Sequence, residues 1–352
     1  MGRVILDNRS RTILLETIND FVVTAEPVGS RTLSKKLSKR LSPATIRNVM
    51  ADLEDLGYLY QPHTSAGRVP TDLGYRYFVN QILDGRKLQP VTPLVSDPEP
   101  YRNQETLEEV LGSACSLLSQ NSHQTGLVMI PGFWNLSLKH IEFMRIEGKR
   151  VLAVFISEMG VVKKKVVRLK EEIPQDKLSA LAAYLNGEFS GQSLNFIQFE
   201  LGRRMRTEKE HHDQLMKKAN DLWNRLFTDH EENGELLIEG VVHMLDQPEF
   251  FADLENMKKL MKTVEEKNKL IKLLDLCMKQ DGLCIIIGEE NAEEEMRAGS
   301  LIAQTYRLDD RNIGTLAIFG PKRMDYEKII GIVNSTANHV SEFLSSKKYK
   351  GA

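Results

Sequence analysis

The chain has 352 residues, of which 41% are hydrophobic and 27% are charged, and its formal net charge is −2. This length is too great for one ordinary hydrophobic core, so we expect two or three domains. No apolar run approaches the ~18 residues of a membrane span, and the N-terminus lacks the apolar stretch of a signal peptide. We therefore expect a soluble, cytoplasmic protein, in which nucleic-acid binding would require a local basic surface.

Two helices are expected before residue 40. The first starts near Asn8, carries an apolar stripe at helical spacing and ends before Pro27. The second follows Ser30, a suitable N-cap. From Ser30 to Ala51 the chain has no acidic residue and six basic ones, namely Arg31, Lys35, Lys36, Lys39, Arg40 and Arg47. In this segment the charge indicates a polyanionic partner.

The third helix has the clearest boundaries. Ser42 is expected to be its N-cap, Pro43 its first residue and Gly57 its C-terminal cap. Its apolar face carries Ile46, Val49, Met50, Leu53 and Leu56. Its opposite face carries Ala44, Arg47, Asn48 and Ala51, with acidic residues only at the far end. Small and hydrogen-bonding side chains near the N-terminus suit a helix that enters the major groove of DNA.

A hairpin and a fourth helix follow. The segment from Tyr58 to Pro70 is typical of strand, turn and strand, with Gly67 supplying a permissive backbone and Arg68 a charge. The fourth helix is expected over residues 72–83. In this order, the helices and the basic hairpin predict a winged helix-turn-helix over residues 1–85. The alternative is a small helical bundle with a solvated basic face.

The winged-helix interpretation gives the exposed side chains distinct roles. Arg47 would contact guanine and Asn48 adenine, while Ser42 and Thr45 would bind phosphate at the positive end of the helix. The basic side chains before the third helix would bind phosphate, and the hairpin tip would contact phosphate or the minor groove. The candidate DNA-binding residues are Arg31, Lys35, Lys36, Ser42, Ala44, Thr45, Arg47, Asn48, His63, Thr64, Ser65 and Arg68.

Beyond this module, prolines between residues 86 and 104 predict a linker. The remaining pattern predicts an α+β domain with an insertion. Strands are expected at 126–130, 141–146, 151–156, 161–169, 283–287, 301–308 and 312–319, and helices at 105–118, 175–185, 203–227 and 325–344. The apolar stripe with Trp223 is either core or a dimer interface, and we favour core.

Several stretches of the sequence resemble the HrcA family of heat-inducible transcription repressors. They are SPATIRNVMADLEDLGYL at Ser42–Leu59, HTSAGRVPTDLGYRYFV at His63–Val79, and the shorter segments Gln247–Phe250 and Gly314–Tyr326. The resemblance spans nearly the whole chain. It implies an α+β multidomain protein, in which a GAF-like domain over 105–149 and 236–345 is interrupted by an inserted α/β dimerisation domain over 150–235.

The resemblance also implies a function. A homodimeric repressor would bind the double-stranded CIRCE inverted repeat upstream of chaperone operons such as those for GroE and DnaK, and heat shock would release it. The GroE chaperonin would modulate the repressor by restoring its activity. One winged helix reads too few base pairs to find one genomic site, so a two-fold pair on an inverted repeat also fits the physics.

Other functional classes have little support in the sequence. No phosphate-binding loop, zinc-peptidase motif or nucleophile elbow occurs, so we expect no enzyme, no cofactor and no metal. Cys115, Cys277 and Cys284 are expected to be buried thiols. Two alternatives remain open: a metabolite-responsive winged-helix regulator with a ligand-binding GAF-like domain, and an interaction protein whose winged helix contacts protein.

Overall fold

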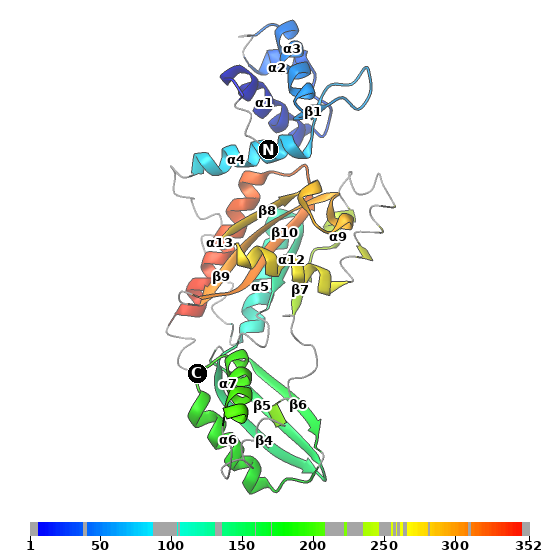
Figure 1. Cartoon of the computed structure of the whole chain (residues 1–352). Helices are drawn as coiled ribbons and strands as arrows, with labels where there is room; N and C mark the ends of the chain where they lie inside the picture. The colour runs from blue at the N-terminus through cyan, green and yellow to red at the C-terminus, as the bar shows by residue number, and fades with distance from the viewer. Residues whose placement is uncertain are drawn as a thin grey trace.

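A computed structural model describes most of the chain in three bodies that follow one another along the long direction of the molecule (Figure 1). The fold is mixed α+β. Among the described residues no helix is long and apolar enough to cross a membrane. The described residues are 6–37, 41–86, 104, 106–130, 136–158, 160–169, 171–207, 222–223, 235–245, 255, 258, 261–262, 266–280, 282–308 and 311–346.

The N-terminal module consists of helices and one short hairpin. Its elements are α1 (Asn8–Thr24), α2 (Ser30–Lys36), α3 (Pro43–Asp55), β1 (Leu59–Tyr60), β2 (Val69–Pro70) and α4 (Asp72–Arg86). Their helical stripes meet in a core that includes Ile13, Ile18, Leu33 and Leu53, all fully buried. The expected helices are therefore confirmed. One detail differs: the N-cap of α2 is Gly29, and Ser30 is its first residue.

The middle body is built around a five-stranded antiparallel sheet with the order β7-β3-β10-β9-β8. The strands are β3 (Thr125–Met129), β7 (Leu236–Glu239), β8 (Leu283–Ile287), β9 (Gly299–Leu308) and β10 (Arg311–Pro321). The expected strands at 126–130, 283–287, 301–308 and 312–319 are confirmed. The short strand β7 was not expected.

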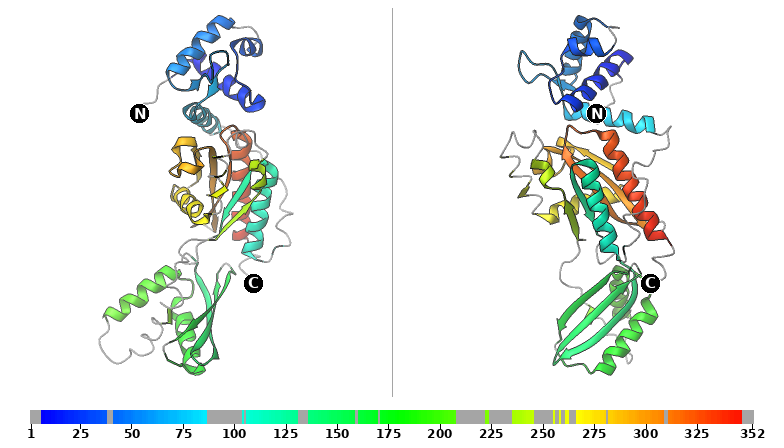
Figure 2. Two further views of the ribbon diagram at one scale, coloured as in Figure 1. Left: turned by 90° about the vertical axis from the view of Figure 1, so that its right-hand side faces the viewer. Right: turned by 180° about the vertical axis from the view of Figure 1, so that it is seen from behind.

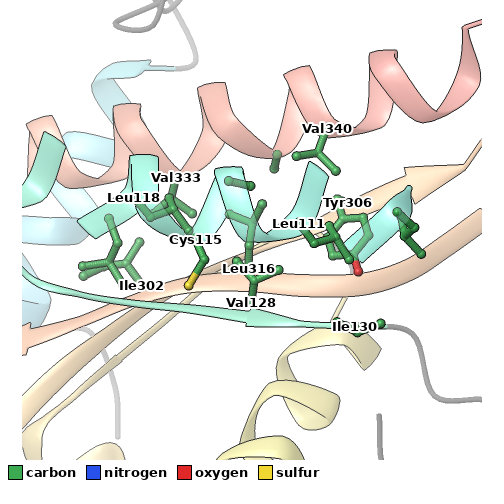
Figure 3. Close-up of a cluster of buried hydrophobic side chains, with 14 of the residues drawn as sticks. Leu111, Cys115, Leu118, Val128, Ile130, Ile302, Tyr306, Leu316, Val333 and Val340 are labelled. Carbon is green, nitrogen blue, oxygen red and sulfur yellow. The ribbon is translucent and has the colours of Figure 1, made fainter. Parts of the chain in front are cut away.

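Helices cover both faces of this sheet (Figure 2). α5 (Leu107–Ser122) and α13 (Tyr326–Ser345) pack together on one face, where side chains such as Leu111, Cys115, Leu316 and Val333 form the core (Figure 3). α12 (Lys267–Lys279) packs on the other face, which holds the second core cluster. Because both faces are covered, successive residues of β10 from Gly314 to Pro321 are all buried. The short helix α9 (Val242–Leu245) follows β7.

The last body is a three-stranded antiparallel sheet with the order β4-β5-β6. It contains β4 (Leu138–Glu147), β5 (Arg150–Ser157) and β6 (Val162–Arg168), with α6 (Gln175–Phe189) against β4, and is followed by α7 (Leu194–Thr207). The structure differs here from the expected division at residue 150. β4 pairs with β5 and not with the five-stranded sheet, so the inserted segment begins before Leu138.

Some expected features can be compared only in part. Cys115, Cys277 and Cys284 are free and buried, as expected. Trp223 is fully buried within the chain, which agrees with the core interpretation. Most of the 203–227 helix, the proline-containing linker and the Gln247–Phe250 segment lie outside the described residues.

The central core contains one buried hydroxyl whose role can be tested. Tyr306 has no exposed surface, and its Oη donates a hydrogen bond of 2.6 Å to the carbonyl oxygen of Met129. Tyr306→Phe should lower the free energy of unfolding of this body by about 1–2 kcal/mol, because a buried acceptor loses its partner. Thermal unfolding would show the loss as a lower midpoint. Tyr60→Phe is the matched control, since Tyr60 is 47% exposed, and equal midpoints for the two variants would contradict the prediction.

Candidate nucleic-acid interface

The local sequence explains why α3 begins and ends where it does. The Ser42 side chain accepts a hydrogen bond of 3.1 Å from the N–H of Thr45, and Pro43 occupies the first helical position, where a missing N–H costs nothing. At the other end Gly57 has φ +78°, and the N–H of Tyr58 donates to the carbonyl of Leu53. Both expected caps are present, so the position of the helix is set by its own sequence.

The two faces of α3 have the expected character in their N-terminal part. Ile46, Val49 and Met50 are buried, whereas Arg47 and Asn48 are exposed. Ala44 and Ser42 are also exposed, and Thr45 is half-buried. Leu56 differs from the expectation: it is 44% exposed, because it lies at the C-cap, where the chain leaves the module core.

The hairpin projects beside α3 with a turn that is organised by Gln61 (Figure 1). Strands β1 and β2 pair Leu59 with Pro70 and Tyr60 with Val69. The Gln61 side-chain amide donates to the carbonyls of Thr64 (3.1 Å) and Ala66 (2.9 Å), while its backbone N–H donates to Glu54. His63, Thr64 and Ser65 are exposed at the tip. Gln61 was not among the expected residues, since a single glutamine in a turn carries no sequence signal.

Arg68 ties the hairpin to α3 instead of extending into solvent. Its guanidinium lies 2.7 Å from a carboxylate oxygen of Glu54, and the side chain is only 17% exposed. The backbone of Arg68 also exchanges two hydrogen bonds of 2.9 Å with Val28. Gly67 permits this close approach, because a Cβ there would lie 2.4 Å from the Val28 carbonyl oxygen. Its expected permissive backbone is thus a matter of space and not of a left-handed conformation.

The basic residues of α2 divide into two kinds. Arg31 and Lys35 are exposed. Lys36 forms an ion pair with Asp20, a carboxylate of α1 that is only 5% exposed. Lys36 therefore neutralises a buried charge and joins α2 to α1. Lys39 and Arg40 lie outside the described residues.

The described residues contain no cluster of three or more His, Cys, Asp or Glu side chains that could hold a metal ion. The surface of α2, α3 and the hairpin instead offers guanidinium, ammonium, hydroxyl and amide donors. Residues 42–51 contain no carboxylate, and Asp52 and Asp55 are exposed at the far end of α3. This arrangement can bind a polyanion and hydrogen-bond to base edges.

Comparisons with known proteins agree with this chemistry. The family described as HrcA protein C terminal domain matches residues 108–330. A heat-inducible transcription repressor HrcA from Geobacter sulfurreducens is 38% identical, over 97% of this chain and 99% of that protein. A protein of the same name from Syntrophobacter fumaroxidans is 36% identical, over 96% and 97%. The chain belongs to the HrcA family.

The chain is therefore a heat-inducible transcription repressor and not an enzyme. The match to the HrcA C-terminal domain begins within α5 and ends within α13, so it includes both sheets and excludes the N-terminal module. A crystal structure of a hypothetical protein, at 2.2 Å resolution, has a similar fold with a TM-score of 0.63. Its sequence is 22% identical, and the match covers 97% of this chain and 99% of that one.

The Arg68–Glu54 pair gives a testable consequence for this HrcA-family chain. Arg68→Ala should loosen the hairpin and raise amide hydrogen exchange of residues 58–70 by about tenfold, since a charged hydrogen bond contributes ~1.5 kcal/mol. Mass spectrometry of the exchanged peptides would measure the change. Lys35→Ala, which removes an exposed charge, should leave exchange in the same peptides unaltered. If the two variants behave alike, Arg68 does not hold the hairpin.

Proposed function

We propose that residues 1–85 form a winged helix-turn-helix that binds double-stranded DNA, with α3 in the major groove. The observation that carries this proposal is the carboxylate-free, exposed N-terminal half of α3, seated on the module core by its buried apolar face. Arg47 and Asn48 would hydrogen-bond to base edges, with Ala44 allowing close approach. Since a repressor acts on the chromosome, the site of action would be the bacterial cytoplasm.

The surrounding donors would bind the phosphate backbone. Arg31 and Lys35 on α2 are exposed beside α3, and Ser42 and Thr45 lie at its positive N-terminal end. His63, Thr64 and Ser65 on the hairpin tip would contact the next stretch of backbone or the minor groove. Lys36 and Arg68 would support this surface mainly through their ion pairs with Asp20 and Glu54.

The DNA target would be the CIRCE inverted repeat upstream of chaperone operons such as those for GroE and DnaK. The middle body would be the GAF-like domain, and the β4-β5-β6 body the inserted dimerisation domain. Heat would shift the marginal balance between active and inactive folds, since a stability of only ~5–10 kcal/mol changes greatly over a modest temperature rise. The GroE chaperonin would refold the inactive chains.

The β4-β5-β6 sheet supports a homodimer because the described part of the chain leaves one of its faces exposed or half-buried, and most side chains of that face are apolar. Phe143, Val151 and Phe155 are buried on the inner face. The outer face consists of three cross-strand rows, which are His140–Ile156–Val162, Glu142–Val154–Lys164 and Met144–Leu152–Val166. Met144, Val162 and Val166 are 42%, 47% and 52% exposed. An apolar face of this kind is typical of a protein–protein interface.

The edges of this sheet favour face-to-face contact over edge pairing. At the β4 edge, Asn186 and Gln175 of α6 bond the backbone groups of Ile141, Phe143 and Arg145. At the β6 edge, Lys163, Lys164 and Lys165 disfavour pairing with another strand. In a face-to-face pair whose two-fold axis runs parallel to β5, Glu142 lies opposite Lys164 of the second copy. Charge complementarity thus favours this one orientation.

The DNA proposal separates base contacts from phosphate contacts. Arg47→Ala should cost about 1–3 kcal/mol of operator binding and relax base preference. Lys35→Ala should weaken all duplexes alike and reduce the salt slope by about one unit if it contacts one phosphate. Electrophoretic shifts with the inverted repeat and with a scrambled duplex, over a salt series, would measure both. Unchanged affinity and specificity for Arg47→Ala would refute the orientation of α3.

The dimer proposal predicts the effect of a single buried charge. Leu152→Glu would place a carboxylate in the row Met144–Leu152–Val166, which has no charged side chain to pair with it, and should weaken self-association at least about tenfold. Sedimentation equilibrium would measure the dissociation constant. Leu276→Glu, at a 53% exposed position on α12, is the matched apolar-to-acid control and should leave self-association unchanged. Retention of the dimer by Leu152→Glu would exclude this face.

A further inference from the structure

Helix α4, the last element of the N-terminal module, lies between the other helices of the module and the central sheet (Figure 2). Its first residue, Asp72, contacts the middle body through two hydrogen bonds. Asp72 Oδ1 accepts from Lys322 Nζ at 2.7 Å. Asp72 Oδ2 accepts from the backbone N–H of Glu289 at 2.9 Å. A carboxylate held between an ammonium and a backbone N–H has little freedom to reorient.

The backbone of the middle body is shaped to receive this carboxylate. Gly288 has φ +50°, and a Cβ on it would lie 2.0 Å from Asp72 Oδ2. Any other residue at this position would displace Asp72. Gly288 begins a single 3-10 turn, Gly288–Glu290, that directly follows β8.

The next turn of α4 makes a second set of contacts through Arg76. Its Nε donates to Glu290 Oε1 at 2.7 Å, and its Nη2 donates to the carbonyl of Ile285 at 2.6 Å and to the other oxygen of Glu290. Glu290 also accepts from the N–H of Ile287 at 2.9 Å. The Arg76–Glu290 pair is therefore doubly bonded and anchored to β8.

Contacts from the loop before α13 complete the arrangement. Arg323 Nη1 donates to the carbonyl of Val22 in α1 at 2.9 Å. The buried Tyr326 hydroxyl donates to the carbonyl of Lys322 at 2.8 Å and so supports the loop that carries Lys322 and Arg323. Burial raises the pKa of Tyr326 well above its ordinary value, which keeps this donor protonated.

Apolar packing between the two bodies is local. The ring centroid of Tyr75 in α4 lies 6.0 Å from that of the buried Tyr326. Beside this pair, an open cleft of about 520 Å³ is lined by residues of both bodies, including Phe21, Tyr60, Leu73, Ala298 and Arg323. A non-directional apolar contact beside an open cleft does not fix an angle, whereas a doubly bonded ion pair does. The orientation of the N-terminal module relative to the middle body therefore depends on the polar contacts of Asp72 and Arg76. We call these two residues, together with Gly288, Glu290 and Lys322, the α4 seam.

We propose that Asp72 and Arg76 are positioning residues for DNA recognition: through the α4 seam they hold each winged helix at the angle that matches the spacing of an inverted repeat. This inference rests on the proposed function, since it requires two winged helices in one dimer. Neither residue needs to contact DNA. Half-site spacing is a geometric property of a dimeric reader, so an altered angle changes which spacing is bound.

The test measures affinity against half-site spacing. Duplexes would carry the inverted repeat with its own spacer, the same repeat with the spacer changed by about half a helical turn (~5 base pairs), and a single half-site. Wild type should prefer its own spacer by about tenfold or more. Arg76→Glu and Glu290→Arg should each reduce the ratio of affinities for the two spacers towards one, while affinity for the single half-site is retained. The double variant, in which the two charges are exchanged, should restore the ratio.

Controls separate the possible failures. Arg145→Glu breaks an exposed ion pair with Glu172 in the β4-β5-β6 body and should leave the preference intact. If Arg76→Glu also loses half-site binding, the ratio of affinities for the two spacers is measured with the milder variants Arg76→Gln and Asp72→Asn. A wild type without spacer preference refutes the inverted-repeat function itself. If the wild-type protein prefers its own spacer and all seam variants keep the same preference, the positioning role is refuted but the inverted-repeat function is not.

Discussion

The arrangement of the molecule depends on α4, one helix whose sides belong to two bodies. Val79 is fully buried in the N-terminal core, and at Gly74 a Cβ would lie 2.3 Å from the Tyr58 carbonyl oxygen, so this side of α4 lies against the hairpin. Asp72 and Arg76 are one helical turn apart and contact the middle body. A rotation of α4 would therefore disturb the hairpin and the central sheet together.

A second junction constrains the other end of the middle body. The inserted segment leaves the five-stranded sheet after β3 and returns at β7, and these strands are neighbours that pair Met129 with Leu236. The N–H of Ile130 also donates to the carbonyl of Glu235 at 2.7 Å. Because these two strands pair, the points at which the chain leaves and re-enters the five-stranded sheet lie side by side.

Local signals in the sequence predicted local structure well, because caps act over three or four residues. Ser42, Pro43 and Gly57 located α3, and short apolar runs located most strands. Sequence patterns could not show which sheet a strand joins, so β4 was expected in the wrong body. They also could not show that Arg68 pairs with Glu54 or that Arg76 pairs with Glu290, 214 residues away. A basic residue in a pattern looks the same whether it binds phosphate or a carboxylate.

A rigid connection between the two DNA-binding modules of a dimer raises the effective concentration of the second module at its half-site. Once one module is bound, the second binds in an intramolecular step. The gain in affinity is largest when the connection spans the two half-sites without distortion. A loose connection lets the second module occupy many positions and so reduces the gain in affinity, even though each module keeps all its DNA contacts. In the proposed dimer this connection would run from α3 through α4, the α4 seam and the five-stranded sheet to the outer face of the β4-β5-β6 sheet. If the proposed function holds, residues that never contact DNA therefore contribute to operator affinity alongside those that do.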